Sequence, residues 1–195
     1  MIYSIQTAVA IDPSEEFYVD SNILYALYSE NLKQTQNEEK YNAYLHFVFK
    51  LMKNKNPLYV SSLNLQEVFH VIEKAEFRDY CKQNHTKIKW KMYRKNKTER
   101  KKVKNKLLNT LHQINSVYEI TEDSILCSDI HQFVNTFEKH QFDPIDFLTV
   151  NPKCFLAGNC KKNFNYITDD SDFKNNIQFQ SSVFMNIYSY EKNEN

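Results

Sequence analysis

Apolar residues along this chain follow two alternating patterns, one typical of short buried strands and the other of amphipathic helices. Short apolar runs, which predict strands, lie at 17–19, 58–62, 116–120, 164–168 and within 181–190. Segments with apolar residues at helical spacing, which predict helices, lie at 20–30, 38–53, 63–77 and 121–140, and a further one begins at Asp143 and Pro144. Strands that alternate with helices indicate an α/β fold, with a mostly parallel central sheet and helices on both of its faces.

Acidic side chains occur where these predicted strands end, or in the helices just beyond them. Asp20 directly follows the first strand, and Glu67 lies about one turn into the helix after the second. Asp146 lies in the first turn of a later helix, and Asp170 and Asp172 follow the fourth strand. Because ligands of parallel α/β sheets bind outside the carboxyl ends of the strands, we expect these acids to converge at one edge of the sheet.

Carboxylates gathered at one edge repel one another, and some stay protonated at neutral pH without a counter-charge. A hard divalent cation such as Mg²⁺ supplies that charge, since it takes oxygen ligands and keeps positions for water and phosphate. The pattern therefore favours a metal-dependent phosphodiesterase site. Each acid taken alone could instead be an ordinary helix cap, and we assign such a structural role to Asp169, whose side chain could equally stay in solvent.

The basic residues are concentrated in one segment. Between residues 82 and 106 there are twelve Lys or Arg residues and one acid, whereas the rest of the chain has thirteen basic and twenty-three acidic residues. Such segregation indicates an anionic partner, and aromatic residues within the segment could stack on unpaired bases of RNA. The predicted RNA-contacting residues are Lys89, Trp90, Lys91, Tyr93, Arg94, Lys95, Lys97, Arg100, Lys101 and Lys102. A solvated helix or a mobile arm is the alternative interpretation of this segment.

Composition argues against several other classes of protein. The single glycine, Gly158, disfavours glycine-rich phosphate loops and dinucleotide-binding fingerprints. The cysteines and histidines lack the spacings of zinc sites, and Ser61 and Ser62 lack the flanking glycines of a nucleophile elbow. No apolar run is long enough to cross a bilayer, and no signal peptide opens the chain. We therefore expect a cytoplasmic protein without membrane contact, with one domain over 1–195 in which 1–16 form an N-terminal extension or a short edge element.

Four segments of the chain share an ordered pattern, in which a strand or a helix start is accompanied by an acid. They read "FYVDSNILYAL", "VSSLNLQEVFHVI", "FDPIDFLTV" and "NYITDDSDF", and together they span 17–173. In this order they resemble the signature blocks of PIN-domain nucleases. On that pattern Asp170 takes the metal-site position of the last block, Asp172 an auxiliary position, and Thr168 contributes the supporting hydroxyl.

The resemblance implies a Rossmann-like PIN fold and cleavage of RNA that depends on Mg²⁺ or Mn²⁺. The residues that would hold the ion are Asp20, Asp146, Asp170 and, as an auxiliary, Asp172. Glu67 would complete the shell or orient the attacking water. Asn22 would hydrogen-bond a neighbouring carboxylate, with an ordinary polar residue early in a helix as the alternative.

Small proteins that resemble this family are often toxins of type II toxin–antitoxin pairs and commonly dimerise, which implies a cognate antitoxin and a homodimer. The other interpretation is a catalytically inactive PIN-like module that binds RNA or a protein partner. Retention of an acid in all four blocks favours the enzyme.

Overall fold

The computed structural model describes residues 1–8, 11–28, 38–121, 131, 134–135, 164–175 and 185–191. The predicted helix at 121–140 lies largely outside these residues. The helix predicted to begin at Asp143, with Asp146 in its first turn, lies entirely outside them.

Six short strands form one sheet in which every pairing is parallel. They are β1 (Ile2–Ser4), β2 (Phe17–Val19), β3 (Leu58–Ser61), β4 (Glu119–Thr121), β5 (Phe164–Ile167) and β6 (Met185–Ser189), in the order β1-β6-β5-β2-β3-β4. Of the two expectations for the N-terminal residues, the edge element is the one seen, because β1 is the outermost strand beside β6. The predicted parallel sheet is confirmed.

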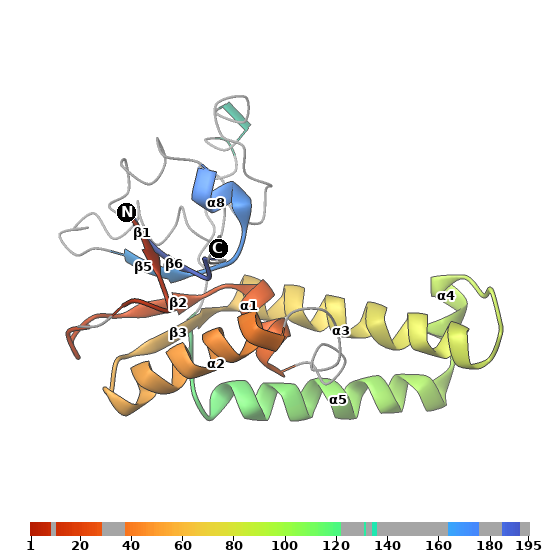
Figure 1. Cartoon of the computed structure of the whole chain (residues 1–195). Coiled ribbons are helices and arrows are strands. Elements are labelled where there is room, and N and C mark those ends of the chain that lie inside the picture. Colours follow the sequence, from red (N-terminus) through yellow and green to blue (C-terminus); the bar gives the residue numbers. More distant parts are fainter. Residues whose placement is uncertain are drawn as a thin grey trace.

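The helices cover both faces of this sheet. They are α1 (Ser21–Tyr28), α2 (Glu38–Lys53), α3 (Ser62–Gln83), α4 (Trp90–Tyr93), α5 (Lys97–Asn115) and α8 (Ser171–Asn175). Figure 1 shows α1, α2, α3 and α5 on one side of the sheet and α8 on the other. Phe17 of β2 packs edge-on against Phe47 of α2, whereas Tyr166 of β5 packs against Phe173 of α8 at 5.1 Å between ring centroids. The predicted Rossmann-like α/β architecture is therefore present.

One predicted strand begins later than the apolar run suggests. The run 116–120 predicts a strand from Ser116, but β4 starts at Glu119. The backbone N–H of Ser116 donates to carbonyls of the last turn of α5, and a turn follows. Tyr118, which contributes to the apolar run, is buried in the core between the helix and the strand. The apolar character therefore marks burial at this position and not strand geometry.

The chain connections change direction at β2. From β2 the chain proceeds to β3 and then β4 on one side, whereas β5 and β6 lie on the other side. Phe17 is accordingly paired both with Leu58 of β3 and with Asn165 of β5. In open parallel sheets, ligands bind at such a switch point, outside the carboxyl ends of the strands. The topology thus places Asp20, which follows β2, at the kind of position where such sheets bind ligands.

The basic segment is part of a long helical hairpin. Figure 1 shows α3 and α5 running side by side away from the sheet, with α4 at the far end of the pair. The two helices are joined by Glu73 of α3, which is 8% exposed and accepts hydrogen bonds from Arg94 (2.6 and 3.1 Å) and Arg100 (2.6 Å). Hydrogen bonding from Arg94 is the main reason that the pKa of Glu73 is lowered. Of the two forms considered for the basic segment, a helix and a mobile arm, the helix is the one observed.

We expect Glu73→Gln to loosen the far end of this hairpin. The substitution leaves two guanidinium groups without a carboxylate, and charge-assisted hydrogen bonds contribute about 1.5–3 kcal/mol each at most. Hydrogen exchange of the α4 and α5 amides should therefore accelerate, while exchange in the sheet is unchanged. Glu99→Gln is the matched control. Among the described residues, Glu99 forms its one ion pair with exposed Lys102 of the same helix, and loss of that pair should cost less than ~0.5 kcal/mol. Equal exchange in the two variants would contradict the role of Glu73.

Candidate functional site

Asp20 is held by the backbone on both sides. Its N–H donates to the carbonyl of Ile167 in β5 (3.0 Å), which continues the sheet hydrogen bonding by one residue. Its own carbonyl accepts from the N–H of Leu24 (3.0 Å) in the first turn of α1. The residue is only 3% exposed. The sequence of a short strand followed at once by a helix therefore leaves this carboxylate little freedom to move.

Side chains or backbone groups of four described residues hydrogen-bond the Asp20 carboxylate. The Ser21 N–H and the Asn64 side-chain amide donate to Oδ1, at 2.6 and 3.1 Å. The Thr168 hydroxyl donates to Oδ2 at 2.5 Å, and the Tyr166 hydroxyl also hydrogen-bonds the carboxylate. Among the described residues no Lys, Arg or His forms an ion pair with it. The negative charge of Asp20 is thus stabilised by neutral donors alone.

The pKa of Asp20 reflects this surrounding. Burial raises the pKa to about 6, although the hydrogen bonds from Thr168, Ser21 and Tyr166 act in the opposite direction. The charge of Glu67 raises it further, which places Glu67 of α3 near Asp20. A buried carboxylate with a neighbouring acid and no positive partner is an environment that a bound cation would stabilise.

Asn64 is a site residue that sequence reasoning did not identify. Ser61 caps α3: its hydroxyl accepts from the Asn64 N–H (3.0 Å) and donates to the Asn64 side-chain carbonyl (2.6 Å). With the carbonyl thus held, the amide nitrogen is directed to Asp20. The spacing of Ser61 and Asn64, which resembles a capping box, was the available signal.

Thr168 connects the ends of β2 and β5. Its hydroxyl donates to Asp20, as above, and accepts from the Asp170 N–H at 3.0 Å. Asp170 Oδ1 in turn accepts from the Asp172 N–H at 2.8 Å, at the start of α8. Asp170 therefore has the geometry of a helix cap, the structural alternative considered for each of the acids, and one of its two carboxylate oxygens serves that cap.

The hydrogen bond predicted from Asn22 to a neighbouring carboxylate stays a prediction. Among the described residues its side-chain amide donates to the Thr168 hydroxyl at 3.5 Å, a long contact, and to no carboxylate. Asp146, another acid of the predicted site, lies outside the described residues. The side-chain amide that donates to Asp20 is that of Asn64.

The side chain of Asp169 does not stay in solvent, which was the alternative that its position left open. It is half-buried and forms ion pairs with Lys40 of α2 and with Lys174 of α8, the latter at 3.2 Å. It also accepts from the Tyr44 hydroxyl at 3.2 Å. Two cations already neutralise this carboxylate, so it has the structural role that was assigned to it, but through contacts across the fold.

The chemistry of the remaining acids fits a hard divalent cation in the type of donor. Asp20 and Asp170 offer carboxylate oxygens beyond the ends of two adjacent strands, β2 and β5, and Glu67 lies close by. Within the described ranges, however, no three acidic, His or Cys side chains are close enough together to hold a metal ion. Asp146, the other predicted ligand, lies outside the described residues.

The predicted RNA-contacting residues divide into two groups. Tyr93 is fully buried among Phe77 and Tyr80 of α3, so its ring has no free face, and the predicted stacking role needs correction. Trp90 is half-buried, with Phe77 at 4.9 Å and the Arg94 guanidinium over its ring at 4.8 Å. Three of the basic residues are used in ion pairs of the hairpin: Arg94, Arg100 and Lys102. Five are exposed and form no ion pair within the described part of the chain: Lys89, Lys91, Lys95, Lys97 and Lys101.

Comparison with known proteins finds no family model that matches this chain and no curated protein similar to it. The fold and the site therefore carry the functional argument. In the described ranges there is no helix with both the length and the apolar character needed to cross a membrane.

Proposed function

We propose that this protein is a metal-dependent endoribonuclease whose site lies at the switch point of the sheet. The observation that carries the proposal is the buried Asp20 at the end of β2, linked through the Thr168 hydroxyl to Asp170 at the end of β5. An isolated buried acid costs stability without a positive partner, so its presence at the expected ligand position favours a functional role over a structural one.

The residues of the chain have distinct tasks in this proposal. Asp20 and Asp170, together with Asp146, would hold Mg²⁺ or Mn²⁺, and Asp172 would assist. When bound, the ion supplies Lewis-acid activation of water and stabilises negative charge on the phosphate. Asn64 and Thr168 fix the rotamer of Asp20 through one hydrogen bond to each carboxylate oxygen. Glu67, the acid nearest Asp20 on α3, would orient the attacking water.

The exposed lysines of the hairpin support RNA as the substrate. Lys89, Lys91, Lys95, Lys97 and Lys101 have no intramolecular carboxylate partner in the described chain, so they are available to phosphates. An acidic site requires such a cationic surface nearby to retain a polyanion. The resemblance of the four sequence blocks further supports a type II toxin, with a cognate antitoxin and a homodimer.

A catalytically inactive RNA-binding module is the second candidate. The observation in its favour is that both oxygens of Asp20 already accept hydrogen bonds from the protein, and that the described residues contain no complete group of three metal ligands. In that case the lysines of the hairpin would bind RNA, and the acids would only organise the sheet edge.

Cleavage of a mixed RNA pool by the purified full-length protein separates the two candidates. If the protein is the proposed nuclease, RNA is cleaved in the presence of Mn²⁺ or Mg²⁺, and cleavage stops when EDTA is added. RNA binding without cleavage at any divalent cation concentration would support the inactive module. Cleavage that persists in EDTA would overturn the metal-dependent mechanism.

Thr168→Val should slow this cleavage by roughly 10–100-fold, the usual cost of removing a partner that orients a metal ligand. The substitution removes the donor to Asp20 and the acceptor for Asp170, while it keeps the β-branched shape. Thr168→Ser retains the hydroxyl and is the matched control, with activity near that of the wild type. If the initial rates of the Val and Ser variants are the same, Thr168 does not position the site.

A further inference from the structure

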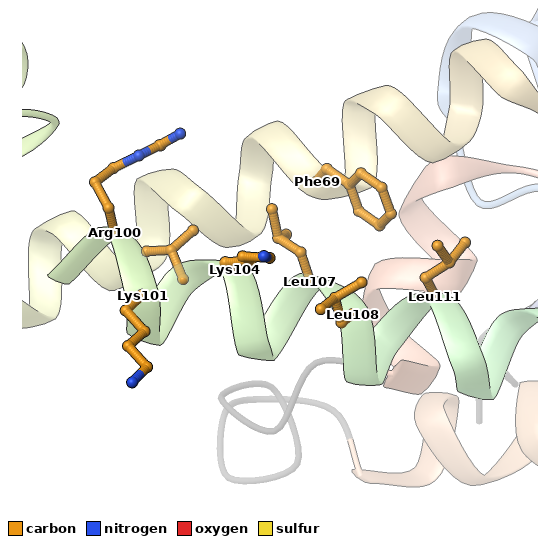
Figure 2. A pocket seen from close by; sticks show the side chains of 8 residues that line it. Phe69, Arg100, Lys101, Lys104, Leu107, Leu108 and Leu111 are labelled. Atoms are coloured by element: carbon orange, nitrogen blue, oxygen red, sulfur yellow. The ribbon is translucent and has the colours of Figure 1, made fainter. Parts of the chain in front are cut away.

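An apolar groove lies between α3 and α5, well separated along the chain from Asp20. Its volume is about 500 Å³, and Figure 2 shows Phe69 of α3 on one wall and leucines of α5 on the other. Leu107 and Leu111 are partly covered by the core, but Leu108 is 41% exposed. Phe69, Leu107 and Leu111 are only partly buried, so Leu108 belongs to a contiguous apolar surface, and such surfaces mark interaction sites where singly exposed residues do not.

The rim of this groove is positively charged. Figure 2 shows Arg100, Lys101 and Lys104 on the α5 turns that precede the leucines. Arg100 is paired with Glu73, but Lys101 and Lys104 are exposed and form no ion pair within the described part of the chain. An apolar floor with a cationic rim is complementary to a ligand that carries both apolar and acidic groups.

The dimensions of the groove suit a helix. The lining runs from Arg100 to Leu111 on α5, about 16 Å at 1.5 Å per residue, which matches a partner helix of roughly three turns. Helices that dock in such grooves present apolar residues at positions i, i+3 or i+4, and i+7. Acidic residues beside that stripe would lie against Lys101 and Lys104.

We infer that this groove binds an acidic amphipathic helix of a partner protein. Two other occupants fit the observations less well. A second copy of this chain in a two-fold arrangement over the groove would bring Lys101 and Lys104 of both copies together. RNA would gain contacts with the rim but little from the valine and leucine floor, and Phe69 is the single aromatic residue among those that line the groove. The inference does not rest on the proposed nuclease activity.

Selection from a displayed library of three-turn helical peptides on the full-length protein tests this inference. The peptides that we expect to be selected carry the apolar stripe together with Asp or Glu. Labelled and measured by fluorescence anisotropy, the selected peptides should bind Leu108→Glu at least ~10-fold more weakly than wild type, because the substitution removes an apolar contact and adds a negative charge that repels their acidic residues. Phe49→Glu is the matched control, since Phe49 is 57% exposed on α2 and lies outside the groove.

Exchanging the charges of the rim and of the peptide tests the inference by a gain of binding, which an unfolded variant would not show. The double variant Lys101→Glu, Lys104→Glu should not bind the selected acidic peptides. It should instead bind peptides in which Lys replaces the acidic residues. Selected peptides that lack acidic residues would overturn the inference. Selected peptides that bind Leu108→Glu and Phe49→Glu equally well would also overturn it. Self-association of the chain that Leu108→Glu abolishes would assign the groove to a second copy, and an RNA cross-link to Leu108 or Lys104 would assign it to nucleic acid.

Discussion

The Asp20→Asn variant should lose RNA cleavage while it keeps its fold and its affinity for RNA. The substitution retains the size of the side chain and the acceptor for the Ser21 N–H, but it removes the charge that a divalent cation requires. The expected loss exceeds the ~10–100-fold that removal of a supporting partner causes, because Asp20 is itself a proposed ligand. Initial cleavage rates at saturating Mn²⁺ measure the loss.

Asp12→Asn is the control for this variant. It makes the same change in charge on an exposed residue in the segment before β2, where the carboxylate caps only a local turn with Ser14. Its cleavage rate and RNA affinity should equal those of the wild type. If Asp20→Asn cleaves as fast as Asp12→Asn, Asp20 is not part of a catalytic site.

The Asp20→Asn substitution should also change how the free energy of unfolding depends on pH in the absence of metal. The folded-state pKa of Asp20 is raised from 3.8 to about 6, so between these two values the folded protein binds a proton that the unfolded chain releases. The free energy of unfolding of the wild type therefore falls as pH rises through this window. Two pKa units correspond to roughly 3 kcal/mol, and the Asp20→Asn variant lacks this loss.

Urea unfolding in EDTA at pH 4 and pH 7 measures the effect. The free energy difference between the wild type and Asp20→Asn should shift by roughly 2 kcal/mol in favour of the variant between these pH values, because pH 4 already lies just above the unfolded-state pKa of 3.8. Comparing the difference between variants cancels the other groups that titrate in both. Asp12→Asn should show no such shift, because the pKa of that exposed carboxyl is lowered by its hydrogen bonds with Ser14. Parallel pH profiles for wild type and Asp20→Asn would mean that Asp20 carries no unfavourable charge in the fold.

Most of the sheet could be predicted, because every strand except β1 overlaps a predicted apolar run. Phe17 to Val19 and Leu58 to Ser61 are apolar runs followed at once by helical spacing, and this repetition implies parallel strands. Parallel strands bring their carboxyl ends together, so the proximity of Asp20 and Thr168 follows from the order of elements alone. Asp146 belongs to the same argument and remains a prediction.

The hydrogen-bond partners within the site could not be predicted in the same way. Asp169 is paired with Lys40, which is 129 positions away, and no local pattern links the two residues. Asn64 has the composition of an ordinary early-helix residue, and only its capping contact with Ser61 directs it to Asp20. Such contacts depend on how elements pack, which sequence spacing does not encode.

In the basic hairpin, the sequence prediction assigned to RNA binding an aromatic residue that is needed for packing. Between residues 82 and 106 charge dominates the composition and conceals the apolar positions. Tyr93 is buried there only because α4 folds back on Phe77 and Tyr80 of α3. The aromatic residues of the segment are needed for packing, and the lysines between them are what remains for a partner.

The most direct test of the proposed cation site is a calorimetric titration of the metal-free protein with Mn²⁺ at pH 7, beside Asp20→Asn and Asp12→Asn. The account predicts saturable binding by wild type and Asp12→Asn, with affinity at least ~10-fold lower for Asp20→Asn. Binding that is equally strong in all three proteins, or no binding in any of them, would contradict a metal site at the end of β2.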